Sequence, residues 1–126
     1  MTSHNAAQGI ILFAHGSRDA QWRQPIEAVA QQIKQLSAQT VVACAYLELT
    51  KPDLASTVEA MSLQNIATID IVPMFLGVGR HAREDLPELV LQLKASYPHI
   101  NFNLRRAVGE EPRLTLTLAE IALNLN

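Results

Sequence analysis

The fold is decided by residues 10–36, which read IILFAHGSRDAQWRQPIEAVAQQIKQL. Residues 10–14 are continuously apolar, which is typical of a strand buried on both faces of a parallel sheet. From Trp22 to Leu36, apolar residues recur at three- and four-residue spacing and mark one face of a helix, so Trp22 is expected to face the core. The stretch therefore predicts one strand followed by one helix.

The same unit recurs three more times along the chain. Apolar runs predict strands at residues 41–46, 69–72 and 100–104, and helical spacing follows at residues 54–61, 86–93 and 114–125. Residues 114–118 also alternate between apolar and polar like a strand, so this last element can be interpreted as a helix or as a strand. Strands that alternate with helices predict a single three-layer α/β domain. Its four-stranded parallel sheet has helices on both faces and the flavodoxin-like strand order 2-1-3-4.

Local signals predict how these elements begin and end. Thr50 is expected to cap the second helix, and Asp85, with Pro87 and Glu88 behind it, the third. Residues 76–84 would then form a loop. Pro73 cannot donate to a ladder, so pairing at the end of the third strand is expected to fail or to be one-sided.

Length and composition bound the function. The chain has 126 residues, which suits one domain at residues 9–126 behind a flexible tail at residues 1–8. A net charge of −2 argues against nucleic-acid binding, and the single cysteine excludes an internal disulfide and an all-cysteine zinc site. No apolar run approaches the roughly 20 residues that span a bilayer, and no signal-peptide pattern precedes residue 10. We therefore expect no membrane partner and a cytoplasmic location.

Three potential metal ligands follow the first three strands. Ligands bind such sheets beyond the carboxyl ends of the strands, where the strand order reverses. His15, Glu48 and His81 stand there, and two imidazoles with a carboxylate suit Co²⁺, Ni²⁺, Fe²⁺ or Zn²⁺. Three protein ligands would leave coordination positions open for catalysis. The alternative is that these residues are ordinary polar groups at the rim of the sheet.

Two glycine-containing turns add possible anion contacts. Gly16 allows a tight turn, and Ser17 is placed to cap the first helix, whose free N–H groups would bind an anion. One glycine is too few for a dinucleotide fingerprint, and a plain turn with a serine cap remains the alternative. Residues 76–84 contain two glycines, two arginines and His81, which is typical of a mobile basic lid over an anionic ligand. The alternative is a solvated loop.

Three motifs resemble those of a known family. They are ILFAHGSRD at residues 11–19, AYLELTKPDL at 45–54 and VPMFLGVGRHAREDLP at 72–87. In this order and spacing they resemble the class II chelatases of the CbiX/SirB type, over a stretch from about Ile10 to Val90. The stretch beyond Tyr97 adds little to the resemblance.

The resemblance implies a lyase that inserts a divalent metal into sirohydrochlorin, in cobalamin or sirohaem biosynthesis. It implies that His15 and His81 bind the metal and take up pyrrole protons, with Glu48 beside them, and that no permanent cofactor is needed. Co²⁺ is favoured, with Fe²⁺ and Ni²⁺ as alternatives. Two other possibilities remain open: a tetrapyrrole- or metal-binding module without catalysis, and a phosphate-binding domain.

The resemblance also implies the short form of these enzymes, which corresponds to half of the longer two-lobed chelatases and works as a homodimer. Sirohydrochlorin is large, flat and rich in carboxylates, so one sheet offers one wall and a second subunit would supply the other. The residues expected to contact this substrate are Gly16, Ser17, Arg18, Gly77, Gly79, Arg80 and Arg83.

Overall fold

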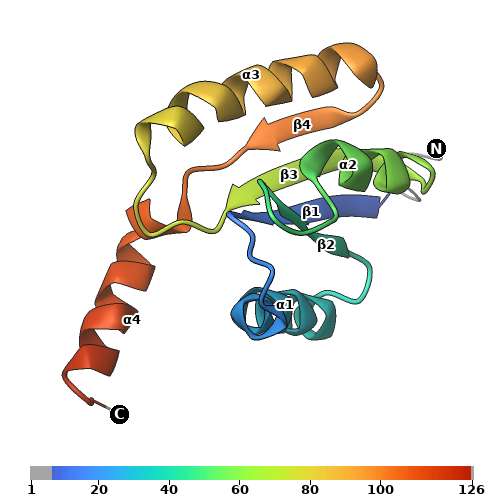
Figure 1. Ribbon diagram of the computed structural model, residues 1–126. Helices are drawn as coiled ribbons and strands as arrows, with labels where there is room; N and C mark the ends of the chain where they lie inside the picture. Colours follow the sequence, from blue (N-terminus) through green and yellow to red (C-terminus); the bar gives the residue numbers. More distant parts are fainter. Residues whose placement is uncertain (1–6, 126) are drawn as a thin grey trace.

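The computed structural model describes residues 7–125 and has three layers around one parallel sheet (Figure 1). The strands are β1 (Ala7–Ala14), β2 (Val41–Tyr46), β3 (Ile66–Pro73) and β4 (Asn101–Leu104). The helices are α1 (Ala20–Leu36), α2 (Leu54–Ser62), α3 (Arg80–Ser96) and α4 (Pro112–Ala122), with a short 3₁₀ turn, η2 (Val108–Glu110), before α4. The strand order is β2-β1-β3-β4, with every pair parallel. The predicted fold class and strand order are confirmed.

The core lies between the sheet and the two helices above it in Figure 1, α2 and α3. These helices contribute Val58, Met61, Leu86, Val90 and Leu93, and the sheet contributes Ile11, Phe13, Ile69, Ile71 and Phe102. Burying one such side chain stabilises the fold by about 1.5–3 kcal/mol. This layer therefore holds the strands in place and carries their carboxyl ends as a rigid edge.

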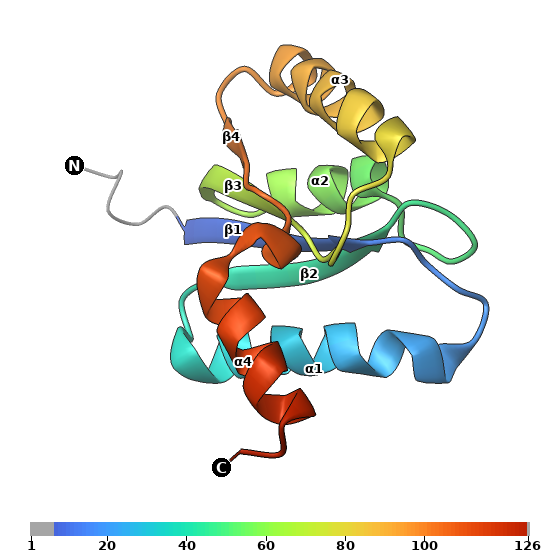
Figure 2. The same ribbon diagram turned by 90° about the vertical axis from the view of Figure 1, so that its left-hand side faces the viewer.

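The opposite face of the sheet is only half covered. α1 packs there on β1 and β2. On the other half, Asp70 of β3 is buried and accepts hydrogen bonds from Gln8 Nε2 (3.3 Å), Asn103 Nδ2 (2.9 Å) and Arg105 Nη1 (3.2 Å). This polar network occupies the place where a fourth helix would complete the layer. Instead, α4 extends away from the sheet, as Figure 2 shows.

Three helices have N-terminal caps other than those predicted. α1 is capped by Asp19, whose carboxylate accepts from Gln21 N (2.9 Å), and α2 by Asp53, which accepts from Ser56 N (2.9 Å). The caps predicted at Ser17 and Thr50 are therefore wrong. Asp19 and Asp53 are the last polar residues before each helix, so their carboxylates reach its free N–H groups.

The largest difference concerns α3. It begins at Arg80, and Arg83 N donates to Gly79 O (3.1 Å), so residues 80–84 are helical and Asp85 is not a cap. A pair between Arg80 Nε and Glu84 Oε1 (3.2 Å) supports this extra turn. The loop after β3 therefore covers residues 74–79, which is shorter than the predicted lid at 76–84.

Smaller differences concern single residues. Ala7 and Gln8 belong to β1, because Ala7 N donates to Asn65 O (2.7 Å) and the strand pairs with β3 from its start. The rest of the predicted tail, residues 1–6, lies outside the described residues. Trp22 is 39% exposed and not part of the core. Pro73 pairs with Phe13 alone, since β4 ends opposite Ile71, so one-sided pairing is confirmed.

Candidate functional site

The first two motifs meet through their backbones. The ladder between β1 and β2 continues past both strands, because Leu47 N donates to Ala14 O (2.9 Å) and Glu48 N donates to His15 O (3.0 Å). His15 and Glu48 therefore lie side by side at the carboxyl edge of the sheet, next to the point where the strand order reverses. Both residues are exposed, so a ligand can reach them from solvent.

The loop after β3 supports the His15 ring. The imidazole packs on the ring of Phe75 with centroids 4.5 Å apart and planes tilted by 45°. Phe75 is buried, and its carbonyl accepts from Gly109 N (2.9 Å), in the turn η2. A Cβ on Gly109 would stand 1.8 Å from Leu76 O, so only glycine permits this contact. The region beyond Tyr97, to which sequence reasoning gave little weight, thus supports the site.

Gly16 allows the backbones of the first two motifs to approach each other closely. Its φ is +103°, and a Cβ there would stand 1.9 Å from Glu48 O. The predicted tight turn is confirmed, and its physical reason is the close approach of the Glu48 backbone. The Asp19 carboxylate caps the start of α1, so an anion bound at this helix end would lie beside a negative charge.

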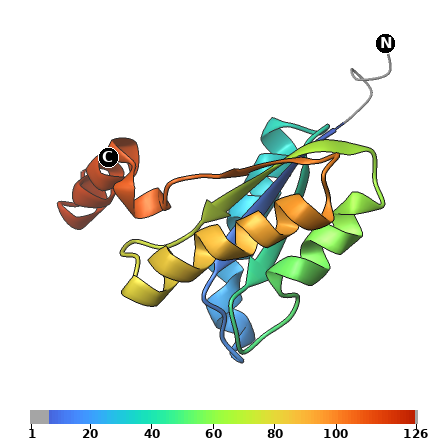
Figure 3. The ribbon, with the colours of Figure 1, turned by 90° about the horizontal axis from the view of Figure 1, so that it is seen from above.

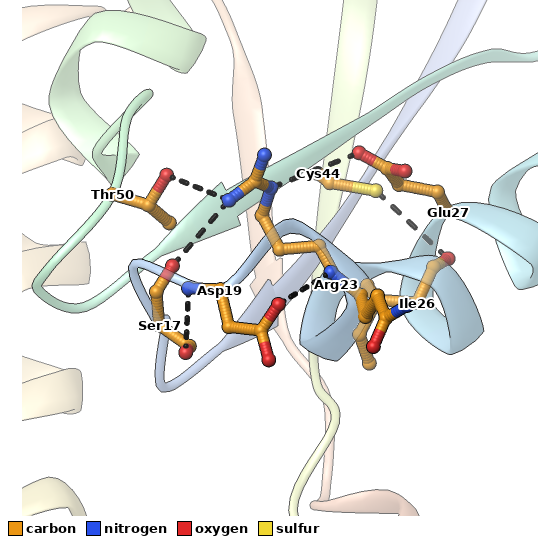
Figure 4. Close-up of polar contacts among 8 residues, drawn as sticks. Ser17, Asp19, Arg23, Ile26, Glu27, Cys44 and Thr50 are labelled. Carbon is orange, nitrogen blue, oxygen red and sulfur yellow. Dashed lines mark hydrogen bonds and ion pairs between the residues drawn. The ribbon is translucent and has the colours of Figure 1, made fainter.

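Arg23 joins the same two loops by its side chain, as Figure 4 shows. Nη1 donates to Ser17 O (3.4 Å) after β1 and to Thr50 Oγ1 (3.4 Å) after β2, while Nε lies 4.0 Å from Glu27 Oε2. Sequence reasoning missed Arg23, because nothing local distinguishes it from other polar residues of an amphipathic helix.

Two further side chains lie on the α1 side of β2. Burial raises the pKa of Tyr46 to about 12, and Tyr46 Oη has no hydrogen-bond partner among residues 7–125. Cys44 is partly buried with Sγ 4.0 Å from Ile26 O, and burial raises the pKa of its thiol (Figure 4). A protonated thiol is a poor metal ligand, so Cys44 does not add to the candidate donors.

His81 comes from a separate element, the first turn of α3, and is exposed. Among residues 7–125, no three His, Cys, Asp or Glu side chains lie together in a group that could hold a metal ion. The structure thus joins His15 and Glu48 but does not assemble them with His81 into one three-ligand centre. The metal and catalytic roles of these three residues stay predictions.

The glycines of the third motif are not required by packing. A Cβ on Gly77 or Gly79 would meet no atom within 4 Å. Gly77 precedes the helix, and Gly79 is the N-terminal cap of α3. Packing therefore does not constrain these two positions of the loop that leads into α3 and His81.

Cationic side chains surround a pocket beside this loop. The pocket measures about 310 Å³ and lies between α3 and the residues that follow β4. Apolar side chains such as Val78 and Leu86 form its walls, and Arg83, Arg105 and Arg106 contribute charge. Arg105 pairs with Asp70 (3.2 Å) and Arg106 with Glu111 (3.7 Å). Arg83 pairs with no acidic side chain of residues 7–125 and is free for a ligand.

Comparison with known proteins identifies the family. The CbiX family model matches residues 9–124, which is nearly the whole chain and includes α4. The chain belongs to the CbiX family. Over 93% of this CbiX-family chain, the fold superimposes on 95% of the crystal structure of a CbiX protein from Marinobacter aquaeolei VT8, with 32% identity and a TM-score of 0.79.

Longer proteins contain the same unit as this CbiX-family chain. The sirohydrochlorin chelatase SirB from Bacillus subtilis subspecies spizizenii, in complex with cobalt, is 25% identical with a TM-score of 0.78, and the match covers 94% of this chain but 50% of SirB. The sirohydrochlorin ferrochelatase of Bacillus subtilis is 28% identical over 81% of this chain and 39% of its own length. The sirohydrochlorin cobaltochelatase of Methanococcus aeolicus is 28% identical over 66% of this chain and 58% of its own length. The chain thus spans 39–58% of the curated relatives named here.

Proposed function

We propose that this CbiX-family chain inserts a divalent metal into sirohydrochlorin, which makes it a lyase of cobalamin or sirohaem biosynthesis. One observation carries the proposal: the backbone bond from Glu48 N to His15 O (3.0 Å), which brings the backbones of these two potential metal-binding residues together at the open edge of the sheet. The names of its relatives, which include both cobaltochelatases and ferrochelatases, support the substrate. Co²⁺ is our first choice of metal, with Fe²⁺ and Ni²⁺ next.

In the proposed reaction the metal is a substrate that must be bound and released. The neutral imidazole of His15 and the carboxylate of Glu48 receive it, and His81 approaches from the first turn of α3. The metal then passes to the four pyrrole nitrogens, and the two N–H protons leave to His15, Glu48 or water, so charge and atoms balance. A loosely assembled ligand set favours release. Acidification should inhibit insertion, because a protonated imidazole cannot bind metal.

The carboxylates of sirohydrochlorin need cationic partners. We assign this role first to Arg83, which is unpaired among residues 7–125 and lines the apolar pocket beside α3. Arg18 is an exposed residue of the first motif, while Arg80 would have to leave Glu84 to bind substrate. The substrate contacts expected of Gly16, Ser17, Gly77 and Gly79 belong to the same proposal. At these positions we expect the protein backbone to lie against the macrocycle.

We further propose a homodimer, in which a second copy supplies the wall opposite the exposed site. The support is that His15, Glu48 and His81 are all exposed and that the chain spans half of SirB. No helix within residues 7–125 has the length and apolar character needed to cross a membrane. The cytoplasmic location expected from the sequence stays a prediction.

The proposal is tested by following metal insertion in the absorption spectrum of sirohydrochlorin under anaerobic conditions. Purified protein is mixed with Co²⁺, Fe²⁺ or Ni²⁺, beside protein-free controls. We expect rapid insertion that is lost in His15→Ala and His81→Ala and retained in His99→Ala, an exposed histidine outside the motifs. Rates no higher than those of the protein-free control with all three metals would leave a binding module without catalysis.

A further inference from the structure

Another pocket lies between α1 and the edge strand β2 and measures about 440 Å³. Figure 2 shows α1 running below β2, and in Figure 3, where the molecule is seen from above, α1 lies behind the sheet, opposite α2 and α3. The described residues that line the pocket include none of the three candidate metal ligands. Several of them are exposed, among them Lys34 and Lys51, so solvent reaches the pocket. It is therefore a cavity that the proposed reaction does not use.

Basic side chains are concentrated in this pocket. Two of the three lysines of the chain, Lys34 and Lys51, line it together with Arg23. Neither lysine forms an ion pair within residues 7–125. Glu27 is the only acidic residue among the described residues of the lining, and its side chain is 57% exposed, so water screens its charge. The pocket therefore has a net positive charge and attracts anions.

The positive charges lie at two ends. Arg23 is near the start of α1 and Lys34 is in its last turn, and the eleven residues from one to the other correspond to about 16 Å of helix. Lys51 follows Thr50, whose hydroxyl accepts from Arg23, so Lys51 belongs to the Arg23 end. Small and apolar residues line the pocket between the two ends: Ala30, Val42 and Ala43. This distribution fits an elongated ligand with an acidic group at each end and an apolar middle.

The pocket also offers a hydrogen-bond donor that has no acceptor. Tyr46 lines it and is only 2% exposed, and Tyr46 Oη has no partner among residues 7–125. The side chains whose charges act on the pKa of Tyr46 are Cys44, Glu27 and Arg23, and all three line the same pocket. The hydroxyl therefore lies near the pocket, and a ligand oxygen would supply the missing acceptor.

Arg23 connects the pocket to the candidate site. Its Nη1 donates to Ser17 O and Thr50 Oγ1, and both bonds are long, at 3.4 Å (Figure 4). A carboxylate pairs with a guanidinium through shorter, charge-assisted bonds that are roughly twice as strong as bonds between neutral groups. An anion in the pocket would therefore draw Arg23 away from the two loops that carry His15 and Glu48.

We propose that this pocket binds a linear organic dicarboxylate, and that its binding slows the reaction at the candidate site by taking Arg23 from the two motif loops. One carboxylate meets Arg23 and Lys51, and the other meets Lys34. The apolar middle of the ligand lies against Ala30 and Val42. The binding site stands without the proposed function, whereas the effect on the reaction rests on it.

Isothermal titration calorimetry of the full chain tests binding, with linear dicarboxylates from succinate to sebacate as probes. We expect one chain length to bind best. The monocarboxylate of that length and inorganic phosphate should bind roughly 10-fold more weakly or less, because each leaves one end of the pocket without its partner. No binding by any dicarboxylate, or equal binding by the monocarboxylate, would overturn the proposed site.

Variants locate the ligand. Lys34→Glu should raise the dissociation constant roughly 10-fold or more, since repulsion replaces attraction. Lys94→Glu is the matched control and should bind like the wild type, because Lys94 is an exposed lysine in the last turn of α3 and does not line the pocket. Tyr46→Phe should raise the dissociation constant about 5-fold through the loss of one hydrogen bond. An unchanged dissociation constant in Lys34→Glu would place the ligand elsewhere and overturn the proposal.

The insertion assay tests the effect on the reaction. A saturating dicarboxylate should lower kcat roughly 10-fold without raising KM for sirohydrochlorin, because the two loops lose their relative position. Competition with sirohydrochlorin, or an equal loss of rate in Lys34→Glu, would show that the dicarboxylate acts on the substrate site or on the free metal, and would overturn the link to Arg23. A chain that binds the dicarboxylate but inserts no metal would contradict the proposed function and leave the binding site standing.

Discussion

Gly16 shows how one residue sets the geometry of the candidate site. Its positive φ and the 1.9 Å that would separate an added Cβ from Glu48 O tie the first motif to the second. Glycine has a different role at Gly77, where an added Cβ would meet no atom within 4 Å. Glycines of one motif set thus differ in physical role, and the difference can be tested by substitution.

Gly16→Ala should destabilise the fold by about 2 kcal/mol or more, because a methyl group adds strain at positive φ and collides with backbone. Metal insertion should fall with it, since Glu48 must move away from His15. Thermal unfolding and the insertion assay measure the two effects. Gly77→Ala is the matched control and should change stability by less than about 0.5 kcal/mol. Equal effects of the two substitutions would contradict the close-approach argument.

Tyr46→Phe should stabilise the protein by about 1 kcal/mol, because it removes a buried hydroxyl that lacks a partner among residues 7–125. The pKa of Tyr46 is raised from 10.0 to about 12, so the folded state keeps this proton after the unfolded state has lost it. Wild-type stability from this group is therefore complete below pH 10 and is lost as the pH rises toward 12. Urea unfolding across this window should show a flatter dependence on pH for Tyr46→Phe. An unchanged slope would contradict the assignment.

At the scale of elements, α1 does more than cover the sheet. Its Arg23 bonds to the loops after β1 and β2, and these loops carry His15 and Glu48. Both bonds are 3.4 Å long and the side chain is partly exposed, so their share of the folding free energy is small. Their value lies in fixing the relative position of two loops.

Arg23→Met should therefore lower kcat/KM for metal insertion roughly 10- to 100-fold, while the free energy of unfolding changes by no more than about 1 kcal/mol. Arg23→Lys, which keeps the charge and one donor group, should recover part of the rate. Lys34→Met, on the last turn of the same helix, controls for loss of charge and should retain activity. Activity that falls only in proportion to stability would show that Arg23 has no positioning role.

The start of α3 shows where element-scale reasoning fails. Asp85, Pro87 and Glu88 match a helix-start pattern, yet the helix begins at Arg80, six residues before the start at Leu86 that this pattern predicts. The pattern is local, whereas the extra turn exists because Arg83 N reaches Gly79 O and Arg80 pairs with Glu84. As a result, His81 and Arg83 belong to a helix and not to a loop.

For the whole molecule, the absence of a preassembled three-donor group within residues 7–125 bears on metal affinity. We therefore expect the fold not to depend on metal, and a saturating chelator should leave Tm unchanged. Added Co²⁺ should stabilise the protein by less than about 1 kcal/mol in differential scanning fluorimetry, because weak binding yields little linkage energy. A large rise in Tm with Co²⁺ would indicate a tight site and argue against rapid transfer of the metal.

Most of the fold can be predicted from the order of apolar runs and amphipathic segments. The four strands and the first three helices follow from periodicity, because burial on one face or on two imposes a period and a length on each element. The strand order needs a further assumption, a flavodoxin-like topology, and periodicity leaves residues 114–118 open between helix and strand. The position of Trp22 and the helix caps do not follow. The caps depend on which of several polar residues reaches a free N–H group, and sequence patterns do not distinguish between neighbouring candidates.

Sequence alone thus determines the four strands and the edge of the sheet at which His15, Glu48 and His81 appear, since each of these residues follows the carboxyl end of a strand. Only the tertiary structure decides that His15 and Glu48 touch through their backbones, that Phe75 and Gly109 support the imidazole, and that α4 remains uncovered. The reason is physical. Periodicity reports how one element meets its surroundings, whereas these contacts join residues far apart in the chain.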